Sequence, residues 1–273
     1  MRRVQFLSII SILTLQLLST TAFSKTDSEF PGRKLYPAIP VISLEDLHTQ
    51  KKQSVIVDVR SEYEFKTLRI KGARNIPLSK RDFVSKMRQL RADSGDTPIV
   101  VYCNGKTCMK SYKAVTKCRK YDIKNVVAYD AGIMDWARKY PDESVLLGKS
   151  PINPNRLISK ANFKKHLISP EKFEVKGARK DTLILDVRDQ FQREGISIFG
   201  AQERRAPLDD NKMMNQFIHQ AKTKGKTLLI YDQAGKQARW LMYRLEDKGL
   251  RNYYFMKGGI SAYYDNLRKQ YIR

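Results

Sequence analysis

The chain has 273 residues, a hydrophobic fraction of 41% and a formal net charge of +24, from 52 Lys and Arg against 28 Asp and Glu. This length suits one large domain or two of ordinary size, and the composition is that of a folded protein with a polar surface, which excludes a disordered or membrane-embedded chain. Three cysteines are too few for a disulfide scaffold, and the three histidines lack metal-ligand spacing, so we expect no metal and no cofactor.

Residues 1–24 have the pattern of a secretory signal peptide. Two arginines precede an apolar run from Val4 to Leu18, and a polar stretch ending in Ala-x-Ser follows. The run is too short to span a bilayer comfortably, which favours cleavage over an uncleaved anchor. We therefore expect an exported, periplasmic protein whose first mature residues, 25–40, form a polar tether.

The positive charge is scattered through both halves of the chain rather than clustered. No nucleic-acid-binding motif accompanies it, and export argues against a nucleic-acid partner. A solvated basic surface is the simplest interpretation. Such a surface can also attract small anionic substrates or an anionic membrane surface.

Strand-like and helix-like patterns alternate over the first predicted domain, 41–145. In chain order the patterns predict a short helix capped by Ser43, a buried strand at 54–60, a helical run at 61–67, a short edge strand near 74–78, a helix at 81–90, a strand at 99–103, a helix at 109–120, a strand at 125–129 and a last helix from Gly132. This alternation predicts an α/β fold: a mainly parallel sheet with helices on both faces.

The same order returns in the second half. Residues 158–163 echo the first helix, Asp186-Val187-Arg188 echoes Asp58-Val59-Arg60, and 228–232 echoes the strand that ends in Cys103. A repeat of this length indicates a duplicated domain rather than a solenoid. We place the linker at 146–156, which is rich in Pro, Gly and Ser, and the second domain at 157–273.

Cys103 lies where a buried strand gives way to a helix. Loop amides and the first turn of that helix point unpaired N–H groups towards such a position, which favours a thiolate over a thiol and binds anions. We predict that Cys103 is a nucleophile, reachable from solvent and held ionised by these amides. The predicted anion-binding loop comprises Asn104, Gly105, Lys106, Thr107, Cys108, Met109 and Lys110.

These landmarks make the chain resemble a tandem rhodanese of the thiosulfate sulfurtransferase superfamily. The resemblance is carried by Asp58-Val59-Arg60, Gly72-Ala73 with Ile76-Pro77-Leu78, Tyr102-Cys103, and Gly132-Ile133 with Trp136. It implies transfer of a sulfane sulfur from thiosulfate or a related donor to cyanide, a thiol or an acceptor protein through a Cys103 persulfide. It also implies that Asp58 and Arg60 brace the active loop.

The active loop departs from the usual rhodanese pattern, Cys-x-x-Gly-x-Arg-Ser. It is two residues longer, and Lys110 stands in the arginine's place. Its Cys-x-Gly-x-x-Cys spacing resembles an exported rhodanese-like branch whose loop runs Cys-x-Gly-Pro-x-Cys-Trp, but this chain has Lys106 and Met109 where that branch has proline and tryptophan. The second copy has the ordinary loop length but carries Asp232 in place of cysteine. We therefore predict an inactive second domain, in which Asp232 has a structural or docking role.

Several alternatives follow from the same residues. Cys103 and Cys108 could form a disulfide in a thiol–disulfide or redox-sensing protein, or Cys108 could contribute only its backbone N–H. The chain could also be a non-catalytic binding module with an inert Cys103. Phosphatase and arsenate-reductase relatives share the longer loop, but Lys110 lacks the bidentate fork of their arginine. Cys118 has the helical spacing of a core residue.

Overall fold

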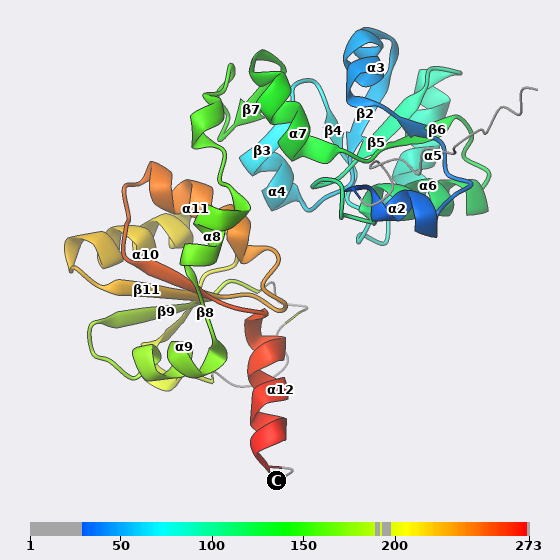
Figure 1. Ribbon diagram of the computed structural model, residues 1–273. Helices are drawn as coiled ribbons and strands as arrows, with labels where there is room; N and C mark the ends of the chain where they lie inside the picture. Colours follow the sequence, from blue (N-terminus) through cyan, green and yellow to red (C-terminus); the bar gives the residue numbers. More distant parts are fainter. Residues whose placement is uncertain (1–28, 189–191, 193–197, 272–273) are drawn as a thin grey trace, which may run out of the picture.

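The computed structural model of the chain describes residues 29–188, 192 and 198–271. The predicted signal peptide, 1–24, lies outside the described residues. Within them, no helix combines the length and the apolar character needed to cross a membrane. Figure 1 shows two α/β units, and the segment that joins them carries α8 (Lys160–Lys165).

The first unit is built on five parallel strands in the order β1-β6-β5-β2-β4. These strands are β1 (Val41–Ile42), β2 (Val55–Asp58), β4 (Arg74–Asn75), β5 (Ile99–Tyr102) and β6 (Val126–Tyr129), and β3 (Leu68–Ile70) pairs separately and antiparallel with β7 (Ser144–Leu146). The helices are α2 (Pro31–Leu35), α3 (Leu44–Thr49), α4 (Glu62–Thr67), α5 (Phe83–Ser94), α6 (Lys110–Lys120) and α7 (Gly132–Lys139), with short 3₁₀ turns at Lys51–Gln53 and Pro141–Glu143.

The second unit repeats this topology, since its sheet order β10-β9-β11-β12-β8 matches the first strand for strand. Its strands are β8 (Leu167–Ile168), β9 (Thr182–Asp186), β10 (Glu203–Arg205), β11 (Thr227–Tyr231) and β12 (Tyr253–Met256). Its helices are α9 (Pro170–Gly177), α10 (Asn211–Thr223), α11 (Ala238–Asp247) and α12 (Gly259–Tyr271), with 3₁₀ turns at Pro154–Arg156 and Gly200–Gln202. The predicted fold class and duplication are confirmed.

One predicted equivalence within the repeat is wrong. The counterpart of α3 is α9, which follows β8 as α3 follows β1, whereas the predicted counterpart at 158–163 contributes to the additional helix α8. Ser43, Ser159 and Ser169 each accept a hydrogen bond from the backbone N–H three residues later. Because a capping serine is a local signal, it marks all three helices alike and cannot identify which one belongs to the sheet.

The predicted polar tether at 25–40 is also wrong where the structure describes it. Residues from 29 onward pack on the first domain, where Arg33 Nε lies 2.8 Å from Asp130 and the Tyr36 ring stacks on Tyr112 with centroids 5.4 Å apart. The five-residue α2 is too short to show helical periodicity. The predicted domain end at 145 likewise falls inside β7, because that strand pairs with β3 of the first domain.

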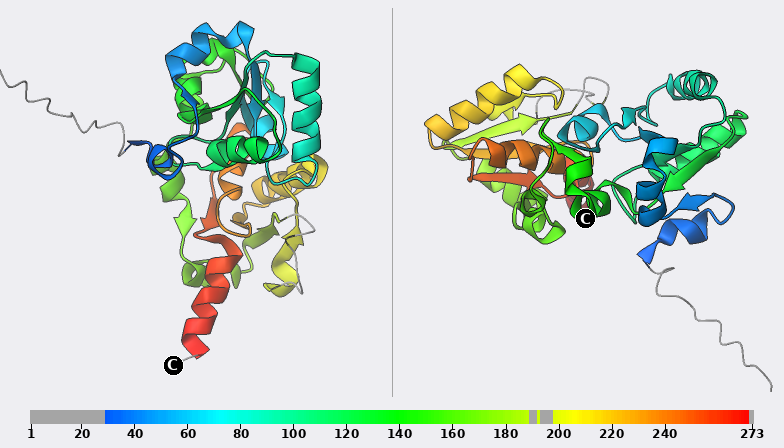
Figure 2. Two further views of the ribbon diagram at one scale, coloured as in Figure 1. Left: turned by 90° about the vertical axis from the view of Figure 1, so that its right-hand side faces the viewer. Right: turned by 90° about the horizontal axis from the view of Figure 1, so that it is seen from above.

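Alternate residues of β5 face two different hydrophobic clusters. Val100 and Tyr102 belong to a cluster that also contains apolar residues of β9 and β11, whereas Ile99, Val101 and Cys103 pack with α5 and α6 on the opposite face. This period of two is that of a strand buried on both faces. The two domains therefore share one hydrophobic cluster, and both views in Figure 2 show the two units next to each other.

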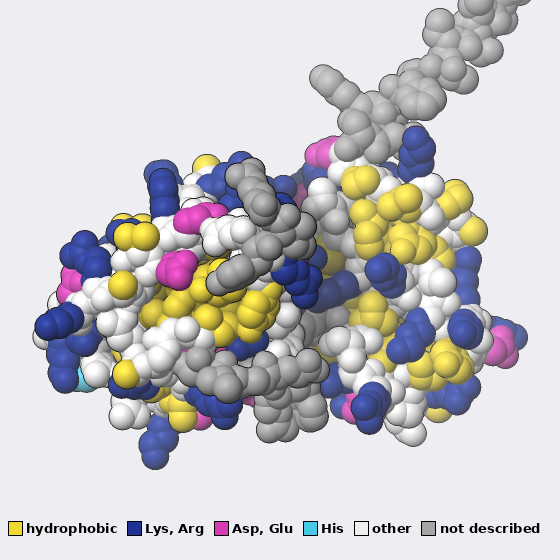
Figure 3. All heavy atoms as spheres, turned by 90° about the horizontal axis from the view of Figure 1, so that it is seen from below, with side chains coloured by type: hydrophobic (Ala, Val, Ile, Leu, Met, Phe, Trp, Pro, Cys, Tyr) yellow, Lys and Arg dark blue, Asp and Glu magenta, His cyan; other side chains and the backbone are white. Residues whose placement is uncertain are grey.

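One face of the molecule shows how the positive charge is distributed. On the face seen in Figure 3, Lys and Arg side chains are spread over both domains. This distribution agrees with a solvated basic surface rather than one dedicated polyanion-binding patch.

Candidate active site

The candidate active loop, 104–109, connects β5 to α6. Cys103 at its start has no exposed surface, Cys108 is half-buried, and Thr107 is exposed. The Cys108 N–H donates to the Gly105 carbonyl over 2.8 Å, which closes a turn within the loop, and Met109 is the first residue flanking α6. The loop is therefore an ordered turn that leads into a helix N-terminus.

The two loop cysteines interact directly. The Cys103 Sγ lies 3.3 Å from the Cys108 carbonyl oxygen and 3.7 Å from Ser111 Oγ. Burial raises the pKa of Cys103 well above its ordinary value. The pKa of Cys108 is lowered to about 6, first because the Cys103 thiol donates a hydrogen bond to its sulfur, and further because the backbone N–H groups of Lys110 and Asn104 face it.

The structure thus differs from the prediction for Cys103 in two respects. The lowered pKa is that of Cys108 rather than Cys103, and Cys103 is closed off from solvent. The cause is the longer loop, which brings a second sulfur into the ring of amides and leaves the first against the core residues of α6. The predicted backbone N–H groups and helix N-terminus are present, but they face a pair of cysteines rather than Cys103 alone.

The two loop lysines have different surroundings. Lys106 lies 3.2 Å from Asp135 and also pairs with Glu29, and the Glu29 hydrogen bond raises the pKa of Lys106. Lys110 lies 3.8 Å from Glu64, and its charge is one of the influences that lower the pKa of Cys108. Lys110 is therefore the predicted cation that acts on the sulfur pair, while two carboxylates flank Lys106.

The side-chain amide of Asn104 is held from both ends. Arg60 Nη1 donates to Asn104 Oδ1 over 3.1 Å, and Asn104 Nδ2 donates to Glu64 Oε1 over 2.8 Å. Arg60 in turn donates through Nε and Nη2 to Asp58 over 2.9 and 2.5 Å, and neither of these two residues is exposed. The structure thus brings the predicted bracing pair onto the loop.

Sequence reasoning missed Glu64. Its Oε2 accepts from the Ser61 N–H over 3.1 Å, as the partner in a capping box for α4. That pattern explains a glutamate at this position without any reference to the active loop. Burial raises the pKa of Glu64, but Arg60 and Lys110 lower it further, so the net shift is downward. Glu64 therefore stays ionised and can hold the Asn104 amide.

In the second domain a carboxylate fills the corresponding loop. Asp232 Oδ1 accepts from the N–H groups of Ala234, over 3.0 Å, and Gly235, while Oδ2 accepts from Gln237 over 2.6 Å and Ala238 over 2.7 Å. Asp232 is 2% exposed. These contacts support the predicted structural role of Asp232, and they show that a loop of this kind can hold a buried anion with backbone N–H groups alone.

Two other predicted residues lie in the core. Cys118 is buried among apolar residues, and burial raises its pKa to about 12. Trp136 has no exposed surface, and its Nε1 donates to the Glu143 carbonyl over 3.1 Å. Across the described ranges, no three His, Cys, Asp or Glu side chains are grouped to hold a metal ion.

The three cysteines should therefore differ in their reaction with iodoacetamide. We expect Cys108 to react first, with a rate that rises with pH through a midpoint near 6. The reason is that Cys108, unlike the other two cysteines, is mainly a thiolate at neutral pH. Cys103 and Cys118 should react far more slowly, because both are buried with raised pKa values. Peptide mass spectrometry after timed labelling measures each site separately.

The control for this labelling is the urea-unfolded chain, in which all three thiols should react at similar rates with midpoints near their ordinary pKa. Labelling of Cys103 ahead of Cys108 in the folded protein would contradict the assignment of the resting charge.

Gly132 should tolerate no side chain, because its backbone lies directly against the active loop. Its φ is +71°, and a Cβ there would lie 2.3 Å from the Gly105 nitrogen and 2.7 Å from the Asn104 carbonyl carbon. We expect Gly132→Ala to lower the free energy of unfolding by about 2 kcal/mol or more, from left-handed strain plus displacement of the loop. The Cys108 labelling midpoint should also rise towards its ordinary pKa.

Gly148→Ala is the matched control, since Gly148 has a φ of +82° but open space around the added Cβ. This variant should cost only the backbone strain, about 1 kcal/mol, and leave the Cys108 labelling profile unchanged. Equal effects of the two substitutions in urea unfolding and labelling would mean that Gly132 does not support the loop.

Comparison with known proteins connects this geometry to a family. Residues 43–139 and 169–266 each match the Rhodanese-like domain family, and together they cover more than half of the chain. A solved thiosulfate sulfurtransferase from Pseudomonas aeruginosa is 18% identical, with a TM-score of 0.35 over 84% of this chain and 46% of that chain.

Two curated relatives are named tRNA uridine(34) hydroxylase. The one from Pelagibacter ubique is 26% identical over 60% of this chain and 52% of its own length, and the one from Protochlamydia amoebophila is 30% identical over 44% and 37%. The chain thus spans about half or less of the curated relatives it matches. Since the domain match covers both sheets in turn, the chain belongs to the rhodanese-like family, with two such domains in tandem.

Proposed function

We propose that the chain is a sulfurtransferase that carries a sulfane sulfur as a persulfide on Cys103, with Cys108 as the base that takes the Cys103 proton. The observation that carries this proposal is the pairing of the two loop cysteines: the buried Cys103 Sγ lies 3.3 Å from the Cys108 carbonyl oxygen, and the hydrogen bond from Cys103 together with loop N–H groups lowers the pKa of Cys108. A base is needed because burial makes a free Cys103 thiolate costly. With a pKa of about 6, Cys108 is ionised at neutral pH.

In the first step, Cys103 Sγ attacks the outer sulfur of thiosulfate or a related donor. A new S–S bond forms on Cys103, its S–H proton passes to the Cys108 thiolate, and the S–S bond of the donor breaks so that sulfite leaves with the bonding electrons. The enzyme is left with a Cys103 persulfide anion and a neutral Cys108 thiol. Because Cys103 is closed off at rest, the loop at 104–109 must shift to admit the donor.

In the second step, an acceptor thiolate or cyanide attacks the terminal sulfur. A bond forms between acceptor and sulfur, the S–S bond to Cys103 breaks, and Cys103 recovers its proton from Cys108. No net oxidation occurs over the cycle. Hydroxylation, the activity in the names of the two curated relatives, is by contrast a net oxidation, so consumption of an electron acceptor would distinguish that reaction from the redox-neutral sulfur transfer that we propose.

The second domain supports the anion-binding part of this proposal. There the loop amides that follow β11 hold the Asp232 carboxylate, at the position where the first domain carries its nucleophile. A persulfide anion on Cys103 would carry its charge on the terminal sulfur, in the loop at 104–110. The Ser111 backbone N–H and hydroxyl also face Cys103 and favour its charged form.

Mass spectrometry of the chain after exposure to thiosulfate tests the proposal. We expect one additional sulfur atom on the Cys103 peptide, with release of one sulfite per chain, and loss of that sulfur on addition of cyanide. An added sulfur on Cys108, with none on Cys103 at any time, would overturn the assignment. The absence of bound sulfur with every donor tried would overturn the activity.

A thiol–disulfide or redox-sensing protein is the second candidate, because the same two sulfurs are within hydrogen-bonding contact. This candidate predicts a Cys103–Cys108 disulfide as the main product of mild oxidation, formed without sulfur transfer. The non-catalytic binding module predicts that Cys103→Ser leaves the cellular activity intact. Phosphatase turnover is expected to be absent, since Lys110 makes only a point-charge contact.

We further propose that residues 1–24 direct export to the periplasm, where the basic surface attracts a small anionic donor and can associate weakly with anionic membrane surfaces. The sulfur acceptor would be a thiol or a protein of that compartment, and not a nucleic acid. Recovery of the chain from the periplasmic fraction with an N-terminus near Lys25 is the expected result. A cytoplasmic chain that begins at Met1 would contradict it.

A further inference from the structure

The inactive second domain meets the first domain beside the active loop. Helix α11, which follows the Asp232 loop, packs against α4 of the first domain. Trp240 on α11 is 1% exposed, although it lies close to the boundary between the domains. A large aromatic side chain of the second domain is thus buried at the boundary with the first domain, where the residues that hold the active loop lie.

Two guanidinium groups lie over this indole, Arg60 of the first domain and Arg239 of the second, the latter with its guanidinium carbon 5.5 Å from the ring centre. The Arg60 guanidinium carbon lies 5.0 Å from the Trp240 ring centre and 5.8 Å from that of Tyr102. Tryptophan gives the strongest cation–π contact of the aromatic residues, and the contact is stronger when both groups are buried, as here. Trp240 also stacks on Tyr243, whose hydroxyl accepts the Ile158 N–H over 3.1 Å, so the indole is itself held in place.

Arg60 connects Trp240 to the two loop cysteines through Asn104. Its Nη1 holds the Asn104 side chain, and the backbone N–H of Asn104 is one of the two that face the Cys108 sulfur. A change in the Arg60 position therefore moves a group that stabilises the thiolate. The second domain reaches the reactive sulfur through two intervening residues.

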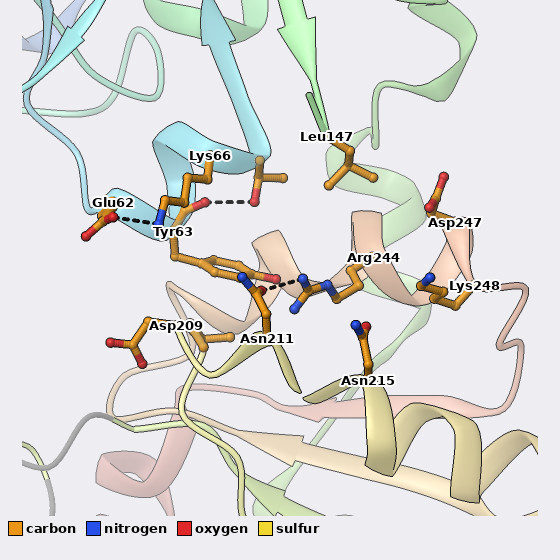
Figure 4. A pocket seen from close by; sticks show the side chains of 12 residues that line it. Glu62, Tyr63, Lys66, Leu147, Asp209, Asn211, Asn215, Arg244, Asp247 and Lys248 are labelled. Atoms are coloured by element: carbon orange, nitrogen blue, oxygen red, sulfur yellow. Dashed lines mark hydrogen bonds and ion pairs between the residues drawn. The ribbon is translucent and has the colours of Figure 1, made fainter. Parts of the chain in front are cut away.

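Helix α4 gives a second contact between the domains. Glu64 on one side of α4 accepts from Asn104, while Tyr63 on the other side lines a cavity of about 300 Å³ together with Asn211 and Arg244 of the second domain. Figure 4 shows the Tyr63 ring directed towards these two side chains. Of the two residues that clamp Asn104, Arg60 thus contacts the second domain directly, and Glu64 lies on a helix that packs against α11.

We propose that Trp240 is a positioning residue for the active loop, so that the first domain's site is complete only when the inactive second domain is docked on it. Its indole holds the Arg60 guanidinium where that group clamps Asn104. This gives the duplicated domain a function after the loss of its own nucleophile. The role of Trp240 in catalysis rests on the proposed function of the loop. Its effect on the pKa of Cys108 does not depend on which reaction the loop catalyses.

The test is the pH profile of Cys108 alkylation in the full-length chain. We expect Trp240→Leu to raise the midpoint by about one pH unit, because one misdirected amide hydrogen bond to an ionised sulfur changes its pKa by about that amount. Trp240→Phe keeps an aromatic face towards Arg60 and should leave the midpoint within a few tenths of a unit. Phe173→Leu is the matched control, since Phe173 is equally buried in the second domain but packs with Phe199 and Tyr231.

A double-mutant comparison distinguishes positioning from general loosening of the fold. Arg60→Lys keeps the charge but loses the fork that reaches Asn104, so it should raise the same midpoint. If Trp240 acts through Arg60, the variant with both changes shifts no further than Arg60→Lys alone. Additive shifts, or an equal shift in Phe173→Leu, would overturn the proposal, as would an unchanged midpoint in Trp240→Leu. Because alkylation needs no sulfur donor, these outcomes are independent of whether sulfur transfer itself is observed.

Discussion

We expect Cys103→Ser to abolish sulfur transfer from thiosulfate to cyanide, a loss of about 10³-fold or more, measured as the rate of thiocyanate formation. A serine hydroxyl is far less ionised at neutral pH than a thiol, and its oxygen cannot form a persulfide. Replacement of sulfur by oxygen at a fully buried position changes little else, so the variant should fold normally.

Cys108→Ser separates the two thiols. If Cys108 acts as the base, its removal should slow the reaction by about a hundredfold and eliminate the pH dependence near 6, while persulfide still forms on Cys103. Cys118→Ser is the neutral comparison, since that thiol lies in the core away from the loop. Full activity in Cys103→Ser together with an inactive Cys108→Ser would assign the sulfur to Cys108.

Asp58→Ala should cause the largest loss of stability of any single change in the site, about 3–5 kcal/mol in the free energy of unfolding. Asp58 and Arg60 have no exposed surface, and removal of the carboxylate leaves a buried guanidinium without its counter-charge. In the intact protein the Asp58 carboxylate more than offsets the effect of burial on the pKa of Arg60, and the variant loses that compensation. A guanidinium keeps its proton even when buried, so Arg60 cannot avoid the cost by becoming neutral. Urea unfolding at 25 °C measures the change.

The duplication provides the control for this prediction. Asp186 and Arg188 form the same buried pair in the second domain, with Nη2 to Oδ2 at 2.9 Å, so Asp186→Ala should also destabilise the fold by several kcal/mol. Arg188 does not reach the active loop, so only Asp58→Ala should raise the midpoint of Cys108 labelling. If both variants changed the labelling equally, the Asp58–Arg60 pair would have a general structural effect rather than a specific one on the loop.

Local patterns were enough to predict most of the secondary structure. Runs of β-branched residues such as Ile99-Val100-Val101 predicted strands buried on both faces, and Ser43 and Ser61 marked two helix starts where the structure has them. Where local signals repeat, they were ambiguous. Ser159 caps α8 as Ser169 caps α9, so the sequence pointed to the wrong counterpart of α3, and only the pairing of β8 with β12 identifies the right one.

For the active loop, too, the sequence predicted some features and left others to the tertiary structure. Cys103 and Cys108 were recognised from their place in the sequence, whereas the position of Lys110 and the bracing role of Asp58 and Arg60 were implied by the resemblance to rhodaneses. The sequence did not indicate which sulfur holds the charge, because that depends on the number of amides facing each one and on its depth in the core. Glu64 was missed because its capping pattern already explains it, and Trp240 because its contact joins residues 180 positions apart in the chain, counted from Arg60 to Trp240.

By itself the sequence determined that this protein is a duplicated α/β chain with one thiol-bearing loop and one loop in which aspartate replaces the thiol, since these features depend on residue identity and short-range order. Only the tertiary structure decided that Cys108 has the lower pKa of the two loop cysteines, that residues 29–40 pack on the first domain and that Trp240 of the second domain contacts Arg60 of the first. Burial, charge pairing and cation–π contact act between groups that folding brings together, and their strengths depend on distances that no stretch of sequence specifies.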